Sequence, residues 1–439
     1  MKILVLYKLS YAPVRKSALA HLYSLQRYSQ DIRFHYFNAI RGVPRYLSAV
    51  KYDGVILHYT FLAKRYHVSK ESWKKFIGEI KNLKGYKIAI PQDEYDETNK
   101  LCTLFKLHNI ETVFTCFDRK EDYLKAYSSD PTRLKHYIPI LTGYIDEQEV
   151  KKLEKHCLPY KDKPIDIGYR ATKMSYLFGR HSQFKHQLAE IFLLKLRNTN
   201  FIYDIAITGD IQKVILGNDW YKFLLKCKAT LGCEGGSSLL DATGEIRKKV
   251  LEFVKLHPDA TFEETERACF PGKDYNIRCF AISPRHFEAA MTKTLQVLVE
   301  GNYNGIFKPY EHYIPIRKDF SNIDEVLELL KDNEYCQKII DKAYNDIVLS
   351  GKYTYRTFAN LVIDHIRKHK NTSISTSKRD EAIFLLVGIY TRVRNIILDI
   401  IIKMFYYGVV EPLKIMGVLY KIKKNPMLYS IAKKLINTF

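Results

Sequence analysis

The feature that most constrains the fold is an alternation of short apolar runs with helix-length amphipathic segments, which starts at the first residues. Segments with helical periodicity, such as Val14–Tyr28 and Lys70–Asn82, separate the runs. Strands that alternate with helices at this spacing usually pair in parallel and are covered on both faces. The first part of the chain is therefore predicted to be a Rossmann-like α/β domain with strands at Ile3–Tyr7, Ile32–Asn38, Gly54–His58, Lys87–Ile90, Thr112–Thr115 and Lys135–Ile138.

The alternation restarts after a charged segment with two prolines, KHCLPYKDKP at 155–164. A chain of 439 residues exceeds the size at which a single hydrophobic core stops growing. We therefore expect two domains, at 1–160 and 161–370. In the second, strands are predicted at Ile165–Arg170, Phe201–Asp210, Lys228–Gly236 and within Gly305–Ile316, and helices at Phe184–Leu196, over most of Pro284–Gly301, and at Asp324–Asp332, Glu334–Ser350 and Thr354–Lys370.

The composition changes after a polar linker, NTSISTS at 371–377. The tail 378–439 contains eleven Lys or Arg against four Asp or Glu, which leaves +7. Its apolar segment is interrupted by charges, so no uncharged run reaches the length of a spanning helix. A basic amphipathic tail is typical of a helix that lies on an anionic membrane surface. The alternative is that its helices pack on the body or on a second subunit.

The formal net charge of the chain is +22. Such a balance favours a polyanionic partner: nucleic acid, an anionic membrane surface or a phosphorylated small molecule. Against nucleic acid, the charge is spread widely and no RNA-binding aromatic motif or helix-turn-helix pattern occurs. We therefore expect no nucleic-acid partner.

Eight cysteines are scattered along the chain, and no two have CxxC spacing. This pattern predicts neither a zinc site nor a disulfide framework, and it fits a reducing compartment. The opening residues MKILVLY resemble a buried strand more than a secretory signal, so we expect a cytoplasmic protein.

Candidate site residues follow the predicted strands, because open α/β sheets bind ligands at the carboxyl ends of their strands. In the first domain these are His58, Asp93 and Glu94. In the second domain the cations Arg170, Arg180 and Lys185 suit a diphosphate near a helix N-terminus, and Glu234 precedes two glycines. Each has a structural alternative: a capping histidine, an acidic turn in solvent, a solvated basic loop or a tight turn. The nicotinamide, P-loop, HExxH and GxSxG fingerprints are absent from the sequence.

Glu288 lies in the first turns of a helix that starts near Pro284. A carboxylate there can simply favour the helix macrodipole. The functional interpretation is a hydrogen-bonded contact with the diol of a nucleotide ribose. The position alone favours the structural interpretation.

The stretch SPRHFEAAMTKTLQVLVEGNYNGIFKPYEHYIPIRKDFSNIDEVLELLKD, at 283–332, resembles the donor-domain signature of GT-B glycosyltransferases. It is most similar to the glycosyl transferases group 1 type and the CgeB-like branch, and DIGYR and GRHSQFK are similar to the start of that domain. The resemblance covers about 164–370. It implies two Rossmann-like domains that face a cleft, a nucleotide-sugar co-substrate, no other cofactor and no bound metal.

The resemblance also implies roles for individual residues. Glu288 matches the glutamate that holds the donor ribose, and Arg170 and Lys185 match the cations that hold the diphosphate. A second glutamate, common eight positions earlier in retaining members, is replaced here by Phe280, which leaves the stereochemistry open. The donor-binding residues expected are Arg170, Arg180, Lys185, Glu234, Arg285, His286 and Glu288, and the catalytic-base candidates are His58, Asp93 and Glu94.

Together these features predict a glycosyltransferase that acts at the cytoplasmic face of the membrane. Its acceptor would be a surface polysaccharide, a lipid-linked glycan or another glycan, and residues 378–439 would hold it on anionic lipid as a peripheral protein. The alternative is a GT-B-like scaffold that has lost catalysis and assists glycan assembly.

Overall fold

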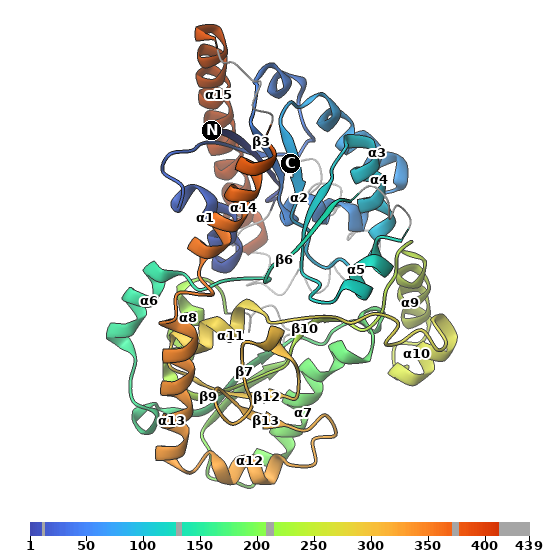
Figure 1. Ribbon diagram of the computed structural model, residues 1–439. Coiled ribbons are helices and arrows are strands. Elements are labelled where there is room, and N and C mark those ends of the chain that lie inside the picture. Colours follow the sequence, from blue (N-terminus) through green and yellow to red (C-terminus); the bar gives the residue numbers. More distant parts are fainter. Residues whose placement is uncertain (11–13, 129–133, 208–214, 371–376, 412–439) are drawn as a thin grey trace.

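The computed structural model describes residues 1–10, 14–128, 134–207, 215–370 and 377–411 (Figure 1). Two α/β domains follow one another along the chain, each built around a parallel sheet. Residues 371–376 of the predicted linker, 412–439 of the predicted tail, and 208–214, which include the end of the strand expected at Phe201–Asp210, lie outside the described residues.

The first sheet has six parallel strands in the order β2-β1-β3-β4-β5-β6. Strands β1, β3 and β5 consist of buried residues, as expected for a sheet that is covered on both faces. The strands are β1 Lys2–Tyr7, β2 Arg33–Asn38, β3 Gly54–Leu57, β4 Tyr86–Ala89, β5 Thr112–Thr115 and β6 His136–Pro139, and the helices are α1 Lys16–Arg27, α2 Tyr59–Leu62, α3 Lys70–Ile77, α4 Thr98–His108 and α5 Lys120–Ala126.

The second sheet has five parallel strands in the order β13-β12-β9-β7-β8. Its core unites these strands with apolar faces of α7, α12 and α13. The strands are β7 Ile165–Ala171, β8 Tyr203–Ile207, β9 Cys227–Gly232, β12 Leu295–Val299 and β13 Ile314–Ile316, and the helices are α6 Glu147–Leu153, α7 Phe184–Leu196, α8 Asn218–Lys226, α11 Pro284–Met291, α12 Ile323–Leu329 and α13 Asn333–Ala343.

An excursion between β9 and α11 forms a small unit beside the first domain (Figure 1). It contains the antiparallel pair β10 Gly235–Ser237 and β11 Cys279–Ala281, with helices α9 Glu245–Leu256 and α10 Phe262–Cys269. Its apolar side chains form a separate cluster around Phe270.

One predicted helix is wrong over half of its length. The expected helix at Pro284–Gly301 ends at Met291, and the residues from Leu295 to Val299 form β12. Lys293 interrupts the helix with a φ of +49°, and the five residues LQVLV are buried between β9 and β13. Continuous burial suits a central strand, and a short apolar run cannot be distinguished from a helix by periodicity alone.

Helix α14, Tyr355–His369, belongs to the core of the first domain although it follows the second in sequence. Its residues Phe358, Val362 and Ile366 pack with Ile3 and Val5 of β1. The expected donor-domain range of 161–370 therefore ends in a helix that packs on the other sheet. Amphipathic periodicity shows that a helix buries one face, but it does not reveal which sheet covers that face.

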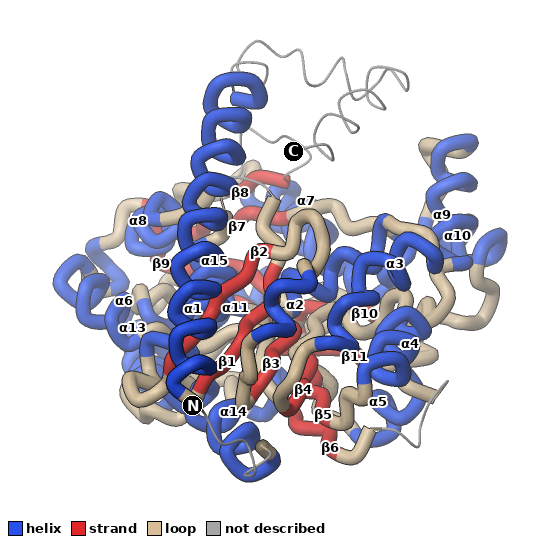
Figure 2. Tube along the Cα trace, turned by 90° about the horizontal axis from the view of Figure 1, so that it is seen from above, coloured by secondary structure: helices blue, strands red, loops and turns tan. Residues whose placement is uncertain are grey.

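Helix α15, Lys378–Phe405, lies along the edge strand β2 (Figure 2). The Asn395 side chain accepts a hydrogen bond from the amide of Asn38 (3.3 Å) and donates to the carbonyl of Tyr36 (2.5 Å). It thus satisfies backbone groups that an edge strand leaves unpaired. At the start of the helix Glu381 pairs with Lys2 and Arg33. The described part of the tail is therefore a helix docked on the body.

The fold prediction is confirmed: two Rossmann-like domains follow one another, and a helical segment is appended at the C-terminal side. Among the described residues, no helix combines the length and apolar character needed to cross a bilayer. All eight cysteines are free thiols.

Candidate active site

A cavity of about 360 Å³ lies between the domains at the carboxyl edge of the second sheet. The chain passes from β7 outward to β8 and then returns to β9 on the other side of β7, which makes the β7–β9 gap the topological switch point of this sheet. Residues that end both strands, Tyr169–Ala171 and Thr230–Cys233, line the cavity. Open α/β sheets bind their ligands at this point. The start of α1 supplies the wall from the first domain with Arg15, Lys16 and Ser17.

Five cations line the cavity, and two of them are in ion pairs, Lys16 with Glu149 and Arg170 with Asp204. The other three are Lys185 at the start of α7, Arg285 at the start of α11 and Arg15 from the first domain. No described side chain makes a hydrogen bond or ion pair with the Lys185 ammonium. Burial lowers its pKa, and the positive charges of Arg285 and Arg15 act in the same direction. An ammonium that is desolvated among like charges favours the arrival of an anion.

Glu288 lies in the second turn of α11 and also lines the cavity. Its Oε2 accepts a 2.8 Å hydrogen bond from the indole Nε1 of Trp220 on α8. Burial raises the pKa of this carboxyl, whereas the Trp220 hydrogen bond and the charges of Arg285 and Arg15 lower it. Trp220 therefore fixes the carboxylate at the wall of a cavity that is otherwise positively charged.

His286 is the neighbouring wall residue and is almost completely buried. Its Nδ1 lies 3.0 Å from the amide nitrogen of Ser283, which donates to it and closes the capping box of α11. Burial lowers the pKa of the imidazole to about 4. The neutral ring accepts at Nδ1, so its proton sits on Nε2, where it is available as a donor.

Arg170 is placed differently from the prediction. Its guanidinium donates to the carboxylate and to the carbonyl of Asp204 on β8, both at 2.8 Å, and lies 4.3 Å from the ring centroid of Phe223. Only its backbone carbonyl is held toward the site, by the Arg285 guanidinium at 2.6 Å. Arg170 lines the cavity, but its charge is committed to a strand-to-strand ion pair.

Arg180 and Glu234 are not among the residues that line the cavity. Arg180 forms ion pairs with Glu263 and Glu266 of α10 and lies over the ring of Phe262. Glu234 is buried and accepts a 2.8 Å hydrogen bond from the amide of Tyr303, which fixes the loop after β12. The structure thus gives both side chains contacts within the protein instead of the expected place at the donor.

The three catalytic candidates of the first domain differ in accessibility. Asp93 is exposed, with a φ of +52°, and its Oδ1 accepts a 2.9 Å hydrogen bond from Tyr95. Asp93 also acts on Lys185 across the domain boundary, where its charge raises the pKa that burial lowers. A non-glycine residue in the left-handed region is strained, and such strain is concentrated at functional sites.

Glu94 and His58 are buried and bonded. Glu94 accepts hydrogen bonds from Thr115 (2.7 Å), the Cys116 amide (2.6 Å) and Tyr127, and burial raises its pKa to about 7. His58 caps α2 and shares a 2.9 Å hydrogen bond with His21. Both groups connect parts of the first domain, as the structural interpretation expects. None of the three candidates, Asp93 included, is among the residues that line the cavity.

Phe280, at the position of the expected second glutamate, lies in β11. Its ring stacks on His181 with 3.7 Å between centroids. Phe280 is not among the residues that line the cavity.

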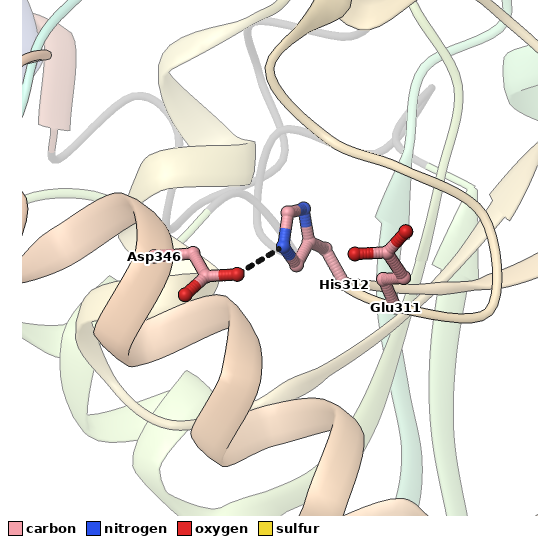
Figure 3. A group of neighbouring side chains, drawn as sticks. All are labelled: Glu311, His312 and Asp346. Carbon is pink, nitrogen blue, oxygen red and sulfur yellow. Dashed lines mark hydrogen bonds and ion pairs between the residues drawn. The ribbon is translucent and has the colours of Figure 1, made fainter.

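One group of described side chains has the spacing of a metal site: Glu311, His312 and Asp346 (Figure 3). His312 already uses both ring nitrogens, because Nδ1 accepts from the Lys308 amide (3.2 Å) and Nε2 lies 3.2 Å from Asp346. Lys342 pairs with both carboxylates. No lone pair of the imidazole is left for a metal ion, and the group does not line the cavity.

Sequence reasoning missed several wall residues, of which Arg15 and Trp220 matter most for the charge and the hydrogen bonding of the cavity. Arg15 precedes a first-domain helix, and nothing in its local pattern connects it with a site in the second domain. Trp220 lies on α8, whose NDWYKFLLK pattern is amphipathic and could have indicated a helix. Its hydrogen bond to Glu288 spans 68 positions in sequence and becomes visible only in three dimensions.

Comparisons with known proteins give structural similarities only. No family model matches the chain, and no curated protein matches it in sequence. Anabaena HepE (Alr3699), solved with UDP, covers 84% of this chain and 100% of its own at 10% identity and a TM-score of 0.44. An OtsA apo structure covers 85% and 100% at 12% identity and 0.43, and AviGT4, described as a glycosyltransferase of avilamycin A biosynthesis, covers 83% and 97% at 10% and 0.38. At these scores the similarity carries no argument about the site, and the description of the site rests on the geometry given above.

Proposed function

We propose that this protein is a glycosyltransferase that takes a sugar from a nucleotide-sugar donor bound in the cavity between its domains. The observation that supports this most is the convergence of Lys185, Arg285 and Arg15 on a switch-point cavity that also contains Glu288. A nucleoside diphosphate sugar presents a diphosphate for the cations and a ribose diol for the carboxylate. A volume of about 360 Å³ lies within the usual range for small-molecule sites.

In the proposed reaction the bond between the anomeric carbon and the diphosphate oxygen breaks, and the acceptor oxygen bonds to that carbon. The leaving diphosphate gains negative charge, which Lys185 and Arg285 stabilise without a bound metal. Preorganised charges of this kind contribute about 3–4 kcal/mol when one donor is removed. Arg285 is held by its bond to the Arg170 carbonyl and so is positioned before the donor arrives.

We propose Asp93 as the group that receives the acceptor proton if the configuration is inverted. It is the exposed carboxylate among the three candidates, and its charge acts on Lys185 of the second domain, although its side chain is not among those that line the cavity. Phe280 removes the second glutamate associated with retaining members, which favours inversion. Glu94 and His58 are better suited to holding the first domain together.

We also propose that the acceptor is a surface-polysaccharide, lipid-linked or related glycan at the cytoplasmic face of the membrane. Helix α15 turns one face to β2 and exposes an apolar stripe on the opposite side, with Leu386, Val393, Ile397, Ile400 and Met404 at exposures of 50–69%. An amphipathic helix with this outer face suits a membrane interface. The basic residues of the tail would add attraction to anionic lipid.

A nucleotide screen tests the proposed donor. UDP, GDP, dTDP and CMP, together with their sugars, would be added to the full chain while thermal unfolding and nucleotide release are measured. A ligand at 100 times its Kd stabilises the folded state by about 2.7 kcal/mol. Binding with release supports the transferase, binding without release supports the inactive scaffold, and no binding by any nucleotide would reject the donor site.

A further inference from the structure

A second hollow runs along the first domain between α1, the edge strand β2 and α15. Its volume is about 1000 Å³, compared with about 360 Å³ for the donor cavity. Helix α1 contributes Leu19, Tyr23 and Gln26, one per turn on a single face, and α15 contributes a row from Phe384 to Tyr407. We refer to this hollow as the α1–α15 groove.

The walls of the groove are mostly hydrocarbon. Aliphatic and aromatic side chains come from β1, α1, β2 and α15, among them Leu9, Phe34 and Ile402. The groove follows α15 over 19 residues, from Phe384 to Ile402, and the 18 rises between them correspond to roughly 27 Å of helix. An elongated groove with apolar side chains along its length and charged ones among them suits a hydrocarbon chain that carries a polar head group.

The groove and the donor cavity are lined by consecutive residues of the chain. Val14 lines the groove, and the next residue, Arg15, lines the cavity. The direction of α15 agrees with this path, because Glu381 pairs with Arg33 at the start of β2 and Asn395 bonds at its end. The helix therefore runs toward the carboxyl edge of the first sheet, where α1 begins and the two domains meet (Figures 1 and 2).

The groove also borders the exposed apolar stripe of the same helix. Ile396 lines the groove and is 54% exposed, whereas its neighbour Ile397 is 51% exposed and belongs to the outer stripe. The basic side chains Arg33, Arg392 and Lys403 lie along the groove, with Asp399 as the acidic one. The outer stripe and the groove are thus adjacent on α15, and a lipid with an anionic head group would meet basic side chains as well as apolar ones there.

We propose that the α1–α15 groove holds the hydrocarbon chain of a lipid-linked acceptor and directs its glycan head to the donor cavity at Arg15. This assignment rests on the proposed function and narrows its acceptor to a lipid-linked one. The chain lies between α1 and α15, and the head group lies where the first-domain cation meets the donor.

The test is photo-crosslinking of the full chain with two soluble probes, a C15 prenyl phosphate and a C16 alkyl phosphate, each with a benzophenone at the chain end. Labelled peptides are mapped by mass spectrometry without vesicles. We expect labels within 19–36 and 384–407, and competition by unlabelled prenyl phosphate. Labels confined to other segments would overturn the assignment, and equal competition by phosphatidylcholine vesicles would show a general lipid contact instead of an acceptor site.

The matched variants are Ile396→Trp, which fills the groove, and Ile397→Trp on the outer face. We expect Ile396→Trp to reduce labelling at least fivefold and Ile397→Trp to change it less than twofold, with equal thermal midpoints. Equal reduction by both would contradict the groove. Nucleotide stabilisation of the wild type and of both variants is measured in parallel. No donor response in the wild type marks failure of the proposed function, and a response without labelling of the wild type marks failure of the groove alone.

Discussion

The two sheets of this protein differ in what lies at their topological switch points: a cavity in one and bonded, buried side chains in the other. In the second domain the gap between β7 and β9 opens into a cavity lined by Lys185, Arg285 and Glu288. In the first domain the corresponding gap lies between β1 and β3, and there His58 is 2% exposed and bonded to His21. Buried polar groups that hydrogen-bond to each other specify a fold. A buried charge without a partner instead lowers the stability of the folded state, unless a ligand supplies the opposite charge.

This difference supports the proposal that the second domain binds the donor. Both sheets carry polar residues at their carboxyl ends, so sequence position alone makes them equivalent. The contacts separate them: Glu94 has three donors from its own domain, while the Lys185 ammonium has none among the described side chains. We therefore assign donor binding to the second domain and most of the buried polar contacts of the first domain to stability.

Asp93→Asn is expected to have the largest effect, because it removes the exposed carboxylate that we propose as the base. A general base contributes about 10²–10⁴-fold to rate, so kcat should fall by that factor. Stability should rise or stay constant, since asparagine tolerates the left-handed region at least as well as aspartate. Steady-state kinetics with urea unfolding checks both values, and an unchanged kcat would remove Asp93 from the mechanism.

Glu94→Gln is expected to act on stability instead. The carboxylate accepts three hydrogen bonds, and an amide at that place turns an NH₂ group toward the donors. An unsatisfied buried group costs about 1–3 kcal/mol, which urea unfolding would measure. The turnover of the folded variant should equal that of the wild type. A hundredfold loss of kcat with normal stability would reverse the roles of Asp93 and Glu94.

The same residue predicts a pH dependence. Burial raises the pKa of Glu94 to about 7 from 4.5, so the folded state binds more protons between these values. The stabilisation is therefore complete below pH 4.5 and is lost as the pH rises through 7. Urea unfolding of the wild type and Glu94→Gln at pH 5 and pH 7.5 should show a larger stability difference at pH 5. A constant difference would mean that the carboxyl does not titrate in this range.

A double-mutant cycle on Arg170 and Asp204 should give a smaller value. The Asp204 side chain is 46% exposed, and ion pairs with a solvent-exposed partner contribute about 1 kcal/mol or less. We expect a coupling of that size in unfolding, with less than threefold change in nucleotide affinity for Asp204→Ala. A tenfold loss of nucleotide affinity in Asp204→Ala would mean that the Arg170–Asp204 ion pair takes part in donor binding, which would contradict a purely structural role of the Arg170 guanidinium.

Sequence patterns predicted most of the fold because buried strands and amphipathic helices are local. The strand at Thr112–Thr115 and the helix at Phe184–Leu196 have the predicted limits. What failed was non-local: β12 depends on its neighbours β9 and β13, and α14 packs on a sheet more than 200 residues earlier in the chain. The resemblance to GT-B enzymes singled out Lys185, Arg285, His286 and Glu288, which line the cavity. It could not show that the Arg170 guanidinium forms an ion pair with Asp204.

Arg180 and Lys185 provide the most direct test of the central claim, because both are cations that the sequence assigns to the donor diphosphate. The measurement is calorimetric titration of the nucleoside diphosphate selected by the screen into Lys185→Met and Arg180→Met. A charged hydrogen bond contributes about 1.5–3 kcal/mol, so Lys185→Met should weaken binding at least tenfold. Arg180→Met, whose charge is paired with α10, should change Kd less than twofold. Equal losses, or a larger loss for Arg180→Met, would contradict the donor site described above.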